Sequence, residues 1–218
     1  MDLFLPLHVK NKNRHVVIIG SGPAGTFAAL QLIKSGIKTT VIEQGKQVQP
    51  RRRDLALLTR GQLVASSNYC FGEGGAGTFS DGKLYTRTKD KEMVHSVLST
   101  LVKHGADADI QVDSRPHIGS NRLPKILVEL REDLMSHGVT YHFEQQVSDL
   151  LIKNGMIKGV ICTSGLEVNA DNVILAVGHS ARSVYTMLNQ RCVALQAKPF
   201  AVGVRIEHKQ SLIDKIQY

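Results

Sequence analysis

Tryptophan is absent from the sequence, and aromatic residues make up only 5% of its 218 residues. The three cysteines, Cys70, Cys162 and Cys192, lie far apart in the sequence, which argues against a CxxC redox pair, a zinc ribbon and a disulfide framework. No apolar run approaches the ~20 residues that a membrane span needs. The apolar start contains Asp2 and Pro6 and is too short for the apolar region of a signal peptide. We therefore expect a cytoplasmic protein without a metal site or a membrane segment.

The net charge of +8 has two interpretations. Basic residues gather at 10–14, 51–53 and 83–91, which fits either a solvated surface that favours small anionic molecules or a nucleic-acid surface. The low aromatic content and the lack of a known nucleic-acid module favour the first interpretation. We expect a small-molecule substrate rather than nucleic acid as the partner, and no pattern indicates an oligomeric state.

Residues 15–42 have the pattern of a βαβ unit. A β-branched run at 15–19 predicts a buried parallel strand, and 38–42 predicts the next one. Between them, 26–35 predicts a helix that Gly36 closes as a C-terminal cap. Such units build sheets with helices packed on their faces.

The turn of this unit reads GxGxxG, with Gly20, Gly22 and Gly25 as its glycines. Gly20 permits the tight turn, Gly22 lets the backbone approach a diphosphate, and Gly25 lets the helix pack closely on the strand. The helix N-terminus offers free N–H groups to the phosphates. Glu43, at the end of the second strand, is expected to accept hydrogen bonds from the adenosine ribose and to disfavour NADP. A structural turn without a ligand is the alternative, but the four parts together favour dinucleotide binding.

Two features favour FAD among the dinucleotides. Residues 23–24, after the second glycine, and 43–45, after the second strand, look like the N-terminal sequences of flavoproteins. Short strands at 147–152, 157–163 and 166–168, with an Asn-Gly turn between the first two, predict an antiparallel meander. In two-domain FAD enzymes of the glutathione-reductase type, such a meander interrupts the parallel sheet.

The whole chain resembles an uncharacterised bacterial family of FAD-dependent dehydrogenases with this glutathione-reductase-type fold. The resemblance lies in residues 17–25, 71–84, 115–119, 176–182 and 198–208. Family members are much longer, so the resemblance implies that the chain is a fragment without a late FAD-contacting segment. It also implies that Arg51, in an Arg-x-x-Asp pattern with Asp54, approaches the cofactor phosphates; a surface arginine is the alternative.

The glycine-rich stretch at 72–83 is predicted to contact the cofactor. Consecutive glycines let a backbone pass close to a ring or phosphate, and their N–H groups form anion nests. Phe71 and Phe79 flank the glycines and argue against a mobile surface loop. We expect Val147, at the start of the meander, to contact adenine, and Gly178 to lie where the chain passes the cofactor. The predicted cofactor-binding residues are Gly20, Gly22, Pro23, Ala24, Gly25, Glu43, Gln44, Arg51, Gly74, Gly75, Ala76, Gly77, Thr78, Val147 and Gly178.

These features predict the dinucleotide-binding portion of an FAD-dependent dehydrogenase. The sequence has one GxGxxG and no CxxC, which disfavours a disulfide reductase and favours a flavin reduced by substrate or by a transiently docked NAD(P)H. Candidates for a catalytic role are His117 and His179 as bases and Lys83 near the N1/C2=O side of the flavin. The alternative is an RNA-linked flavoprotein or a non-catalytic nucleotide-binding fragment.

The predicted fold is an α/β, Rossmann-type FAD/NAD(P)-binding domain with a parallel sheet, a three-stranded antiparallel meander and part of a second, substrate domain. Its expected divisions are a basic lead-in at 1–14, the nucleotide-binding domain at 15–190 and a truncated substrate or cap domain at 191–218. A strand at 200–206 without a later partner should leave apolar surface open near Phe200 and Val204. From this we expect weak FAD binding by the chain. The further elements predicted are helices at 50–58, 92–104, 123–137, 181–189 and 211–216, and strands at 139–143 and 172–178.

Overall fold

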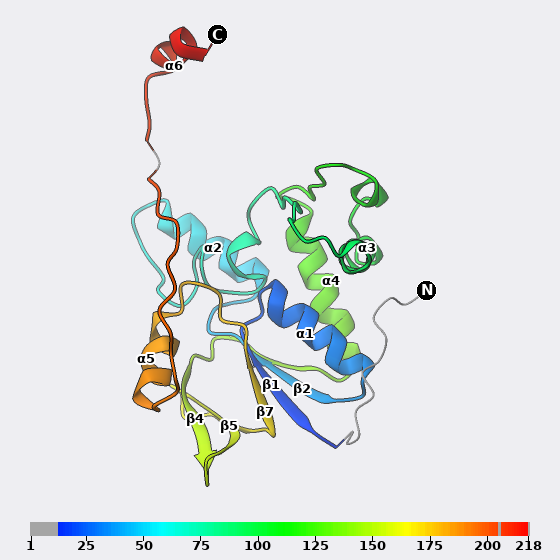
Figure 1. The fold of residues 1–218 in the computed structure, drawn as a ribbon, viewed down its shortest axis with the longest axis vertical. Coiled ribbons are helices and arrows are strands. Elements are labelled where there is room, and N and C mark those ends of the chain that lie inside the picture. Colours follow the sequence, from blue (N-terminus) through cyan, green and yellow to red (C-terminus); the bar gives the residue numbers. More distant parts are fainter. Residues whose placement is uncertain (1–12, 205, 218) are drawn as a thin grey trace.

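The computed structural model describes residues 13–204 and 206–217, and its centre is a parallel sheet of four strands in the order β3-β2-β1-β7 (Figure 1). The strands are β1 (His15–Ile19), β2 (Lys38–Ile42), β3 (Thr140–His142) and β7 (Asn172–Leu175). Val17 and Ile18 are fully buried, because helices or strands cover both faces of β1. The predicted strands of the βαβ unit are confirmed, whereas β7 is shorter than the predicted 172–178.

Successive side chains of the central strands point to opposite faces, so the sheet has two apolar cores. On one face, Val16 and Ile18 join a core with α1 (Pro23–Lys34), α3 (Lys91–Lys103) and α4 (Leu123–Ser136). On the other face, Val17 and Ile19 pack against the meander and α5 (Arg182–Gln190). Figure 1 shows α1 and α4 on one side of the sheet and the meander with α5 on the other. The molecule is therefore built in three layers.

The predicted meander is confirmed as a separate antiparallel sheet in the order β4-β5-β6. Its strands are β4 (Val147–Lys153), β5 (Met156–Cys162) and β6 (Glu167–Asn169). Asn154 and Gly155 both have positive φ, 52° and 72°, as a tight type I′ hairpin turn requires. The Asn-Gly signal therefore marked the hairpin correctly.

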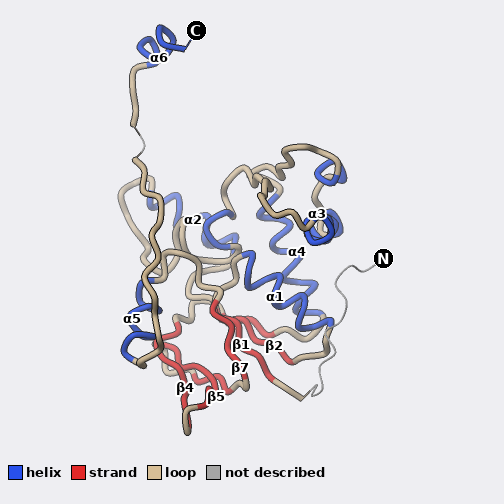
Figure 2. The backbone as a smooth tube through the Cα atoms, viewed as in Figure 1, coloured by secondary structure: helices blue, strands red, loops and turns tan. Residues whose placement is uncertain are grey.

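Between β2 and β3 the chain forms α2 (Val48–Leu58), a long loop with a 3-10 turn at Gly75–Gly77, α3, a second 3-10 turn at Ala108–Gln111, and α4. Figure 2 shows how much of this stretch is loop rather than helix. Two helices begin earlier than predicted: α1 at Pro23 rather than 26, and α2 at Val48 rather than 50. The N–H groups of the first helical turn have no acceptor within the helix, so proline, which has no N–H, fits these positions.

The predicted strand at 200–206 is wrong for the residues that the structure describes. Residues 200–204 and 206 have no strand conformation, and Phe200, Val202 and Val204 are 83%, 79% and 83% exposed. Apolar residues do alternate along this segment, but no described strand lies beside it to pair with its backbone. The predicted exposure of Phe200 and Val204 is confirmed. Beyond this segment lies α6 (Gln210–Gln217), away from the rest of the molecule (Figure 1).

Within the described ranges, no helix is both long enough and apolar enough to cross a membrane.

Candidate nucleotide-binding site

The glycine-rich turn between β1 and α1 needs two of its three glycines for the fold itself. Gly20 has a φ of +105°, and a Cβ there would overlap the carbonyl oxygen of Ala176. A Cβ on Gly25 would overlap the carbonyl oxygen of Gly20, where helix and strand approach each other. Both positions therefore exclude side chains for reasons of backbone packing.

Gly22 is different, because nothing in the fold requires a glycine there. Its φ of −71° is open to any residue, and the nearest atom to an added Cβ is the Cα of Gly75 at 3.7 Å, an ordinary contact. Gly22 does line a cavity of the described chain, so open space lies beside it. An empty space beside the second glycine is what a bound diphosphate requires.

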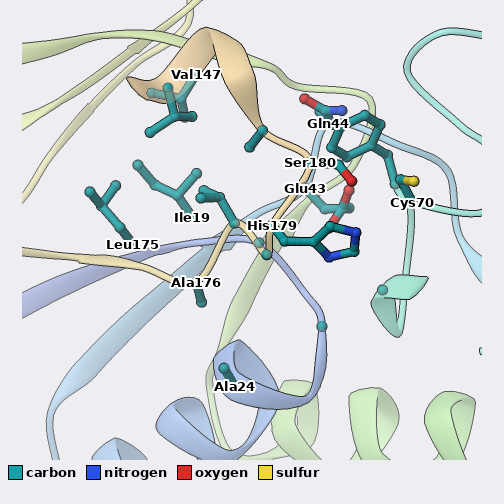
Figure 3. Close-up of a pocket in the computed structure, with 18 of the residues that line it drawn as sticks. Ile19, Ala24, Glu43, Gln44, Cys70, Val147, Leu175, Ala176, His179 and Ser180 are labelled. Carbon is teal, nitrogen blue, oxygen red and sulfur yellow. The ribbon is translucent and has the colours of Figure 1, made fainter. Parts of the chain in front are cut away.

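This cavity, about 410 Å³, opens at the carboxyl ends of the parallel strands. The chain leaves β1 toward β2 on one side and later returns to β7 on the other side, so the cavity lies at the topological switch point where ligands bind in such sheets. Figure 3 shows Ile19, Val147 and Leu175 gathered in one part of the pocket, and Gln44 and Cys70 in another. The pocket thus offers an apolar compartment for a flat base next to a turn suited to phosphate.

Glu43 lies beside the pocket as predicted, but the chain already uses its carboxylate. One oxygen accepts hydrogen bonds from the N–H and the hydroxyl of Ser21, both at 2.9 Å. The other accepts from the N–H groups of Gly45 at 2.9 Å and Gly72 at 3.0 Å. A carboxylate has about four acceptor positions, so none remains for a ribose hydroxyl. In this structure Glu43 joins three backbone segments around the pocket.

Arg51 does not reach the pocket, which contradicts the predicted contact with cofactor phosphates. Its side chain is buried beneath the loop at 68–78, and its guanidinium donates to the carbonyl oxygens of Asn68, Tyr69, Glu73 and Gly75 and to the hydroxyl of Thr78. Burial lowers the pKa of Arg51 to about 10. These partners occupy the donors of the guanidinium, so Arg51 fixes the loop and leaves no donor for a ligand.

The loop that Arg51 fixes forms one side of the pocket. Gly74 donates its N–H to the carbonyl oxygen of Ser21 at 3.0 Å, and the backbone of Gly75 lies against Gly22. Gly75 and Ala76 line the pocket. The other predicted residues that line it are Gly20, Gly22, Pro23, Ala24, Glu43, Gln44, Val147 and Gly178, whereas Gly25, Arg51, Gly74, Gly77 and Thr78 do not.

A buried ion pair that the sequence did not reveal holds the same loop to two helices. The Glu73 carboxylate accepts from the N–H of Val48 at 2.7 Å, at the start of α2, and from Nε of Arg131 at 2.7 Å, on α4. Burial raises the pKa of Glu73 above its ordinary value. Arg131 is 58 residues away along the chain, so no local pattern predicts this contact.

The three catalytic candidates fall into two places, with Lys83 and His117 together and His179 apart from them. Lys83 is exposed, lies 3.3 Å from Asp81 and pairs through its backbone with His117, outside the pocket. Of the three, only His179 lines the pocket. Cys70, Phe71, Gln145 and Tyr185 are further pocket residues that were not predicted. Phe71 could have been found from its place beside the glycine-rich stretch, whereas the other three become neighbours only through the fold.

Comparisons with known proteins agree with this geometry. Residues 13–60 match a family model described as FAD binding domain. An uncharacterized protein of Clostridium beijerinckii is 41% identical over 203 residues, which cover 93% of this chain and 38% of that protein. A tRNA uridine 5-carboxymethylaminomethyl modification enzyme of Alkaliphilus metalliredigens is 25% identical over 166 residues, which cover 75% of this chain and 24% of the enzyme.

Among solved structures, glycerol-3-phosphate dehydrogenase of Bacillus halodurans complexed with FAD matches with a TM-score of 0.51 and 12% identity, over 81% of this chain and 36% of that one. The chain spans less than two fifths of the length of each of these three proteins. Together the comparisons show a Rossmann-type fold, and the FAD binding domain model matches the residues of its first βαβ unit.

Proposed function

We propose that this chain binds FAD in the pocket described above and is the nucleotide-binding portion of an FAD-dependent dehydrogenase. The observation that carries the proposal is the open space beside Gly22, at the start of α1 and at the switch point of the sheet. The match of residues 13–60 to an FAD binding domain supports FAD over other dinucleotides.

The residues present fit the parts of this cofactor. The N–H group of Ala24, in the first turn of α1, has no partner within the helix and suits a diphosphate. The apolar compartment around Ile19 and Val147 suits the adenine ring. Gly75 and Ala76 bring the glycine-rich loop to the same cavity. When bound, FAD supplies the hydride-transfer chemistry, and the protein positions it.

The source of electrons is part of the proposal. A single GxGxxG within the sequence, together with the absence of a CxxC pair, favours reduction of the flavin by the substrate itself or by NAD(P)H that docks transiently. Steady-state reduction of an artificial acceptor with a panel of hydroxy and amino compounds, with and without NADH or NADPH, separates these two routes.

Purification and equilibrium dialysis test the proposal directly. We expect FAD, added to the purified chain, to bind with a stoichiometry of one and to be displaced by ADP, because ADP shares the adenosine and diphosphate. NADP should displace it poorly. Binding of FAD that ADP does not displace would place the cofactor elsewhere, and no saturable binding would overturn the proposal.

A second candidate is an RNA-linked flavoprotein. The 25% identity to a tRNA uridine modification enzyme favours it, and the net charge of +8 suits an RNA backbone. Filter binding of tRNA, with competitor RNA and at several salt concentrations, tests this candidate. Specific binding would persist against an excess of unrelated RNA. A purely electrostatic interaction would be displaced by that RNA and would weaken steeply as salt rises.

A further inference from the structure

We infer that His179 supplies the cationic side-chain contact to the diphosphate of the bound dinucleotide, the role that the family resemblance implied for Arg51. The inference rests on the proposed function and assigns a binding residue within the same site.

The first support is the charge of the pocket lining. A dinucleotide diphosphate carries two negative charges, yet no lysine or arginine lines the pocket within the described residues. The titratable side chains that do line it are Glu43 at the end of β2, Cys70 on the loop, Tyr185 on α5 and His179. Of these, only histidine becomes a cation, so His179 is the one described lining side chain that can balance part of the phosphate charge.

The second support is the place of the segment that carries His179. After β7 the chain crosses the glycine-rich turn so closely that a Cβ on Gly20 would overlap the carbonyl oxygen of Ala176. Gly178, with a φ of +71°, then turns the chain before His179. Residues 176–177 therefore lie against the phosphate-binding turn, and Gly178 leads from them to His179.

The third support is the side chain itself. Figure 3 shows the imidazole of His179 projecting into the pocket, and the residue is exposed. Within the described part of the chain no hydrogen bond engages its ring, in contrast to His104, whose two ring nitrogens face the carbonyl oxygen of Thr100 and the carboxylate of Asp133. An imidazole with free nitrogens in an open cavity is available to a ligand.

This position also decides between two roles for His179. A base in hydride transfer must reach the proton of a substrate next to the flavin ring. His179 instead lines the pocket two residues after 176–177, which lie against the glycine-rich turn at the diphosphate end of such a site. The geometry therefore points to binding rather than to proton abstraction.

The test compares four variants in FAD and ADP binding by calorimetry. His179→Ala and His179→Gln should raise the Kd for both ligands about tenfold at pH 6, as expected for loss of one charge-assisted hydrogen bond. His179→Lys, which keeps a cation, should bind within about threefold of the wild type. His95→Ala serves as the matched control, because His95 is an exposed histidine on α3 outside the pocket, and it should bind like the wild type.

The lysine variant separates a charge contact from a structural role, because His179→Lys keeps a cation but lacks the imidazole ring. Equal affinity of His179→Ala and the wild type at pH 6 would overturn the inference, as would equally weak binding by His179→Lys and His179→Ala. If the wild type itself bound neither FAD nor ADP, the proposed function would fail first and the inference with it.

Discussion

Replacing Glu43 with glutamine should destabilise the fold around the pocket, although the two side chains have nearly the same shape. The carboxylate accepts four hydrogen bonds, from Ser21 (twice), Gly45 and Gly72, and is 5% exposed. An amide has one accepting oxygen and one donating NH₂ group. Its best orientation points the oxygen at the N–H groups of Gly45 and Gly72, since both of them can only donate.

The NH₂ group of the glutamine side chain would then face Ser21, whose hydroxyl can rotate to accept, but the N–H of Ser21 would lose its partner. One buried N–H without a partner costs about 1–3 kcal/mol, and two bonds to a charged acceptor become bonds to a neutral one at a loss of about 1 kcal/mol each. Water that enters from the open pocket would restore part of this lost hydrogen-bond energy. We expect the Glu43→Gln variant to lose about 2–4 kcal/mol of unfolding free energy.

Urea unfolding followed by far-ultraviolet circular dichroism measures this loss, since the chain has no tryptophan for fluorescence. The matched control is Glu167→Gln, because Glu167 is an exposed glutamate on β6, and it should change the unfolding free energy by less than about 0.5 kcal/mol. If the two variants unfolded at the same urea concentration, the four hydrogen bonds would not hold the three segments together, and Glu43 would be free to serve a ribose instead.

Two further substitutions test the loop. Arg51→Lys keeps the charge, but the lysine cannot reach the carbonyl oxygens of Asn68 and Gly75 together with the hydroxyl of Thr78. We therefore expect the variant to lose about 3 kcal/mol of unfolding free energy in urea and to bind FAD more weakly. An unfolding free energy equal to that of the wild type would show that the loop does not need the guanidinium. Glu73 should make stability depend on pH. Its pKa is raised in the folded state, so the folded chain holds the proton more tightly, and its contribution to stability is largest below the unfolded pKa of about 4.3 and declines as pH rises through the raised folded value. The unfolding free energy of the wild type, relative to Glu73→Gln, should therefore fall between pH 4 and pH 7; a relative increase would contradict the assigned direction.

The sequence predicted those parts of the fold that depend on local patterns. The β-branched run at 15–19 and the Asn-Gly pair at 154–155 each specify their conformation from neighbouring residues, and both appear where expected. The prediction of a strand at 200–206 was wrong. Alternating side chains favour the extended conformation, but a strand also needs a neighbouring strand for its backbone hydrogen bonds. The described chain supplies no such neighbour.

The site was predictable in its position but not in the roles of its polar side chains. GxGxxG followed by Glu43 located the pocket, because that spacing encodes the turn, the helix and the strand end together. Whether Arg51 points into the pocket or beneath the loop depends on carbonyl groups 17 to 24 residues further along, which no local pattern places. The ion pair between Glu73 and Arg131 was missed for the same reason.

The most direct test of the central claim is FAD binding by Gly22→Val, measured by calorimetry beside the wild type and Gly25→Val. Gly22 has room for a side chain on the protein side, so Gly22→Val should keep its far-ultraviolet dichroism and lose FAD affinity by at least about 100-fold, because the side chain takes the space of the diphosphate. Gly25→Val should instead fail to fold normally, since its side chain would overlap the carbonyl oxygen of Gly20. A folded Gly22→Val variant that binds FAD as tightly as the wild type would contradict the account, because the diphosphate would then lie somewhere other than the glycine-rich turn.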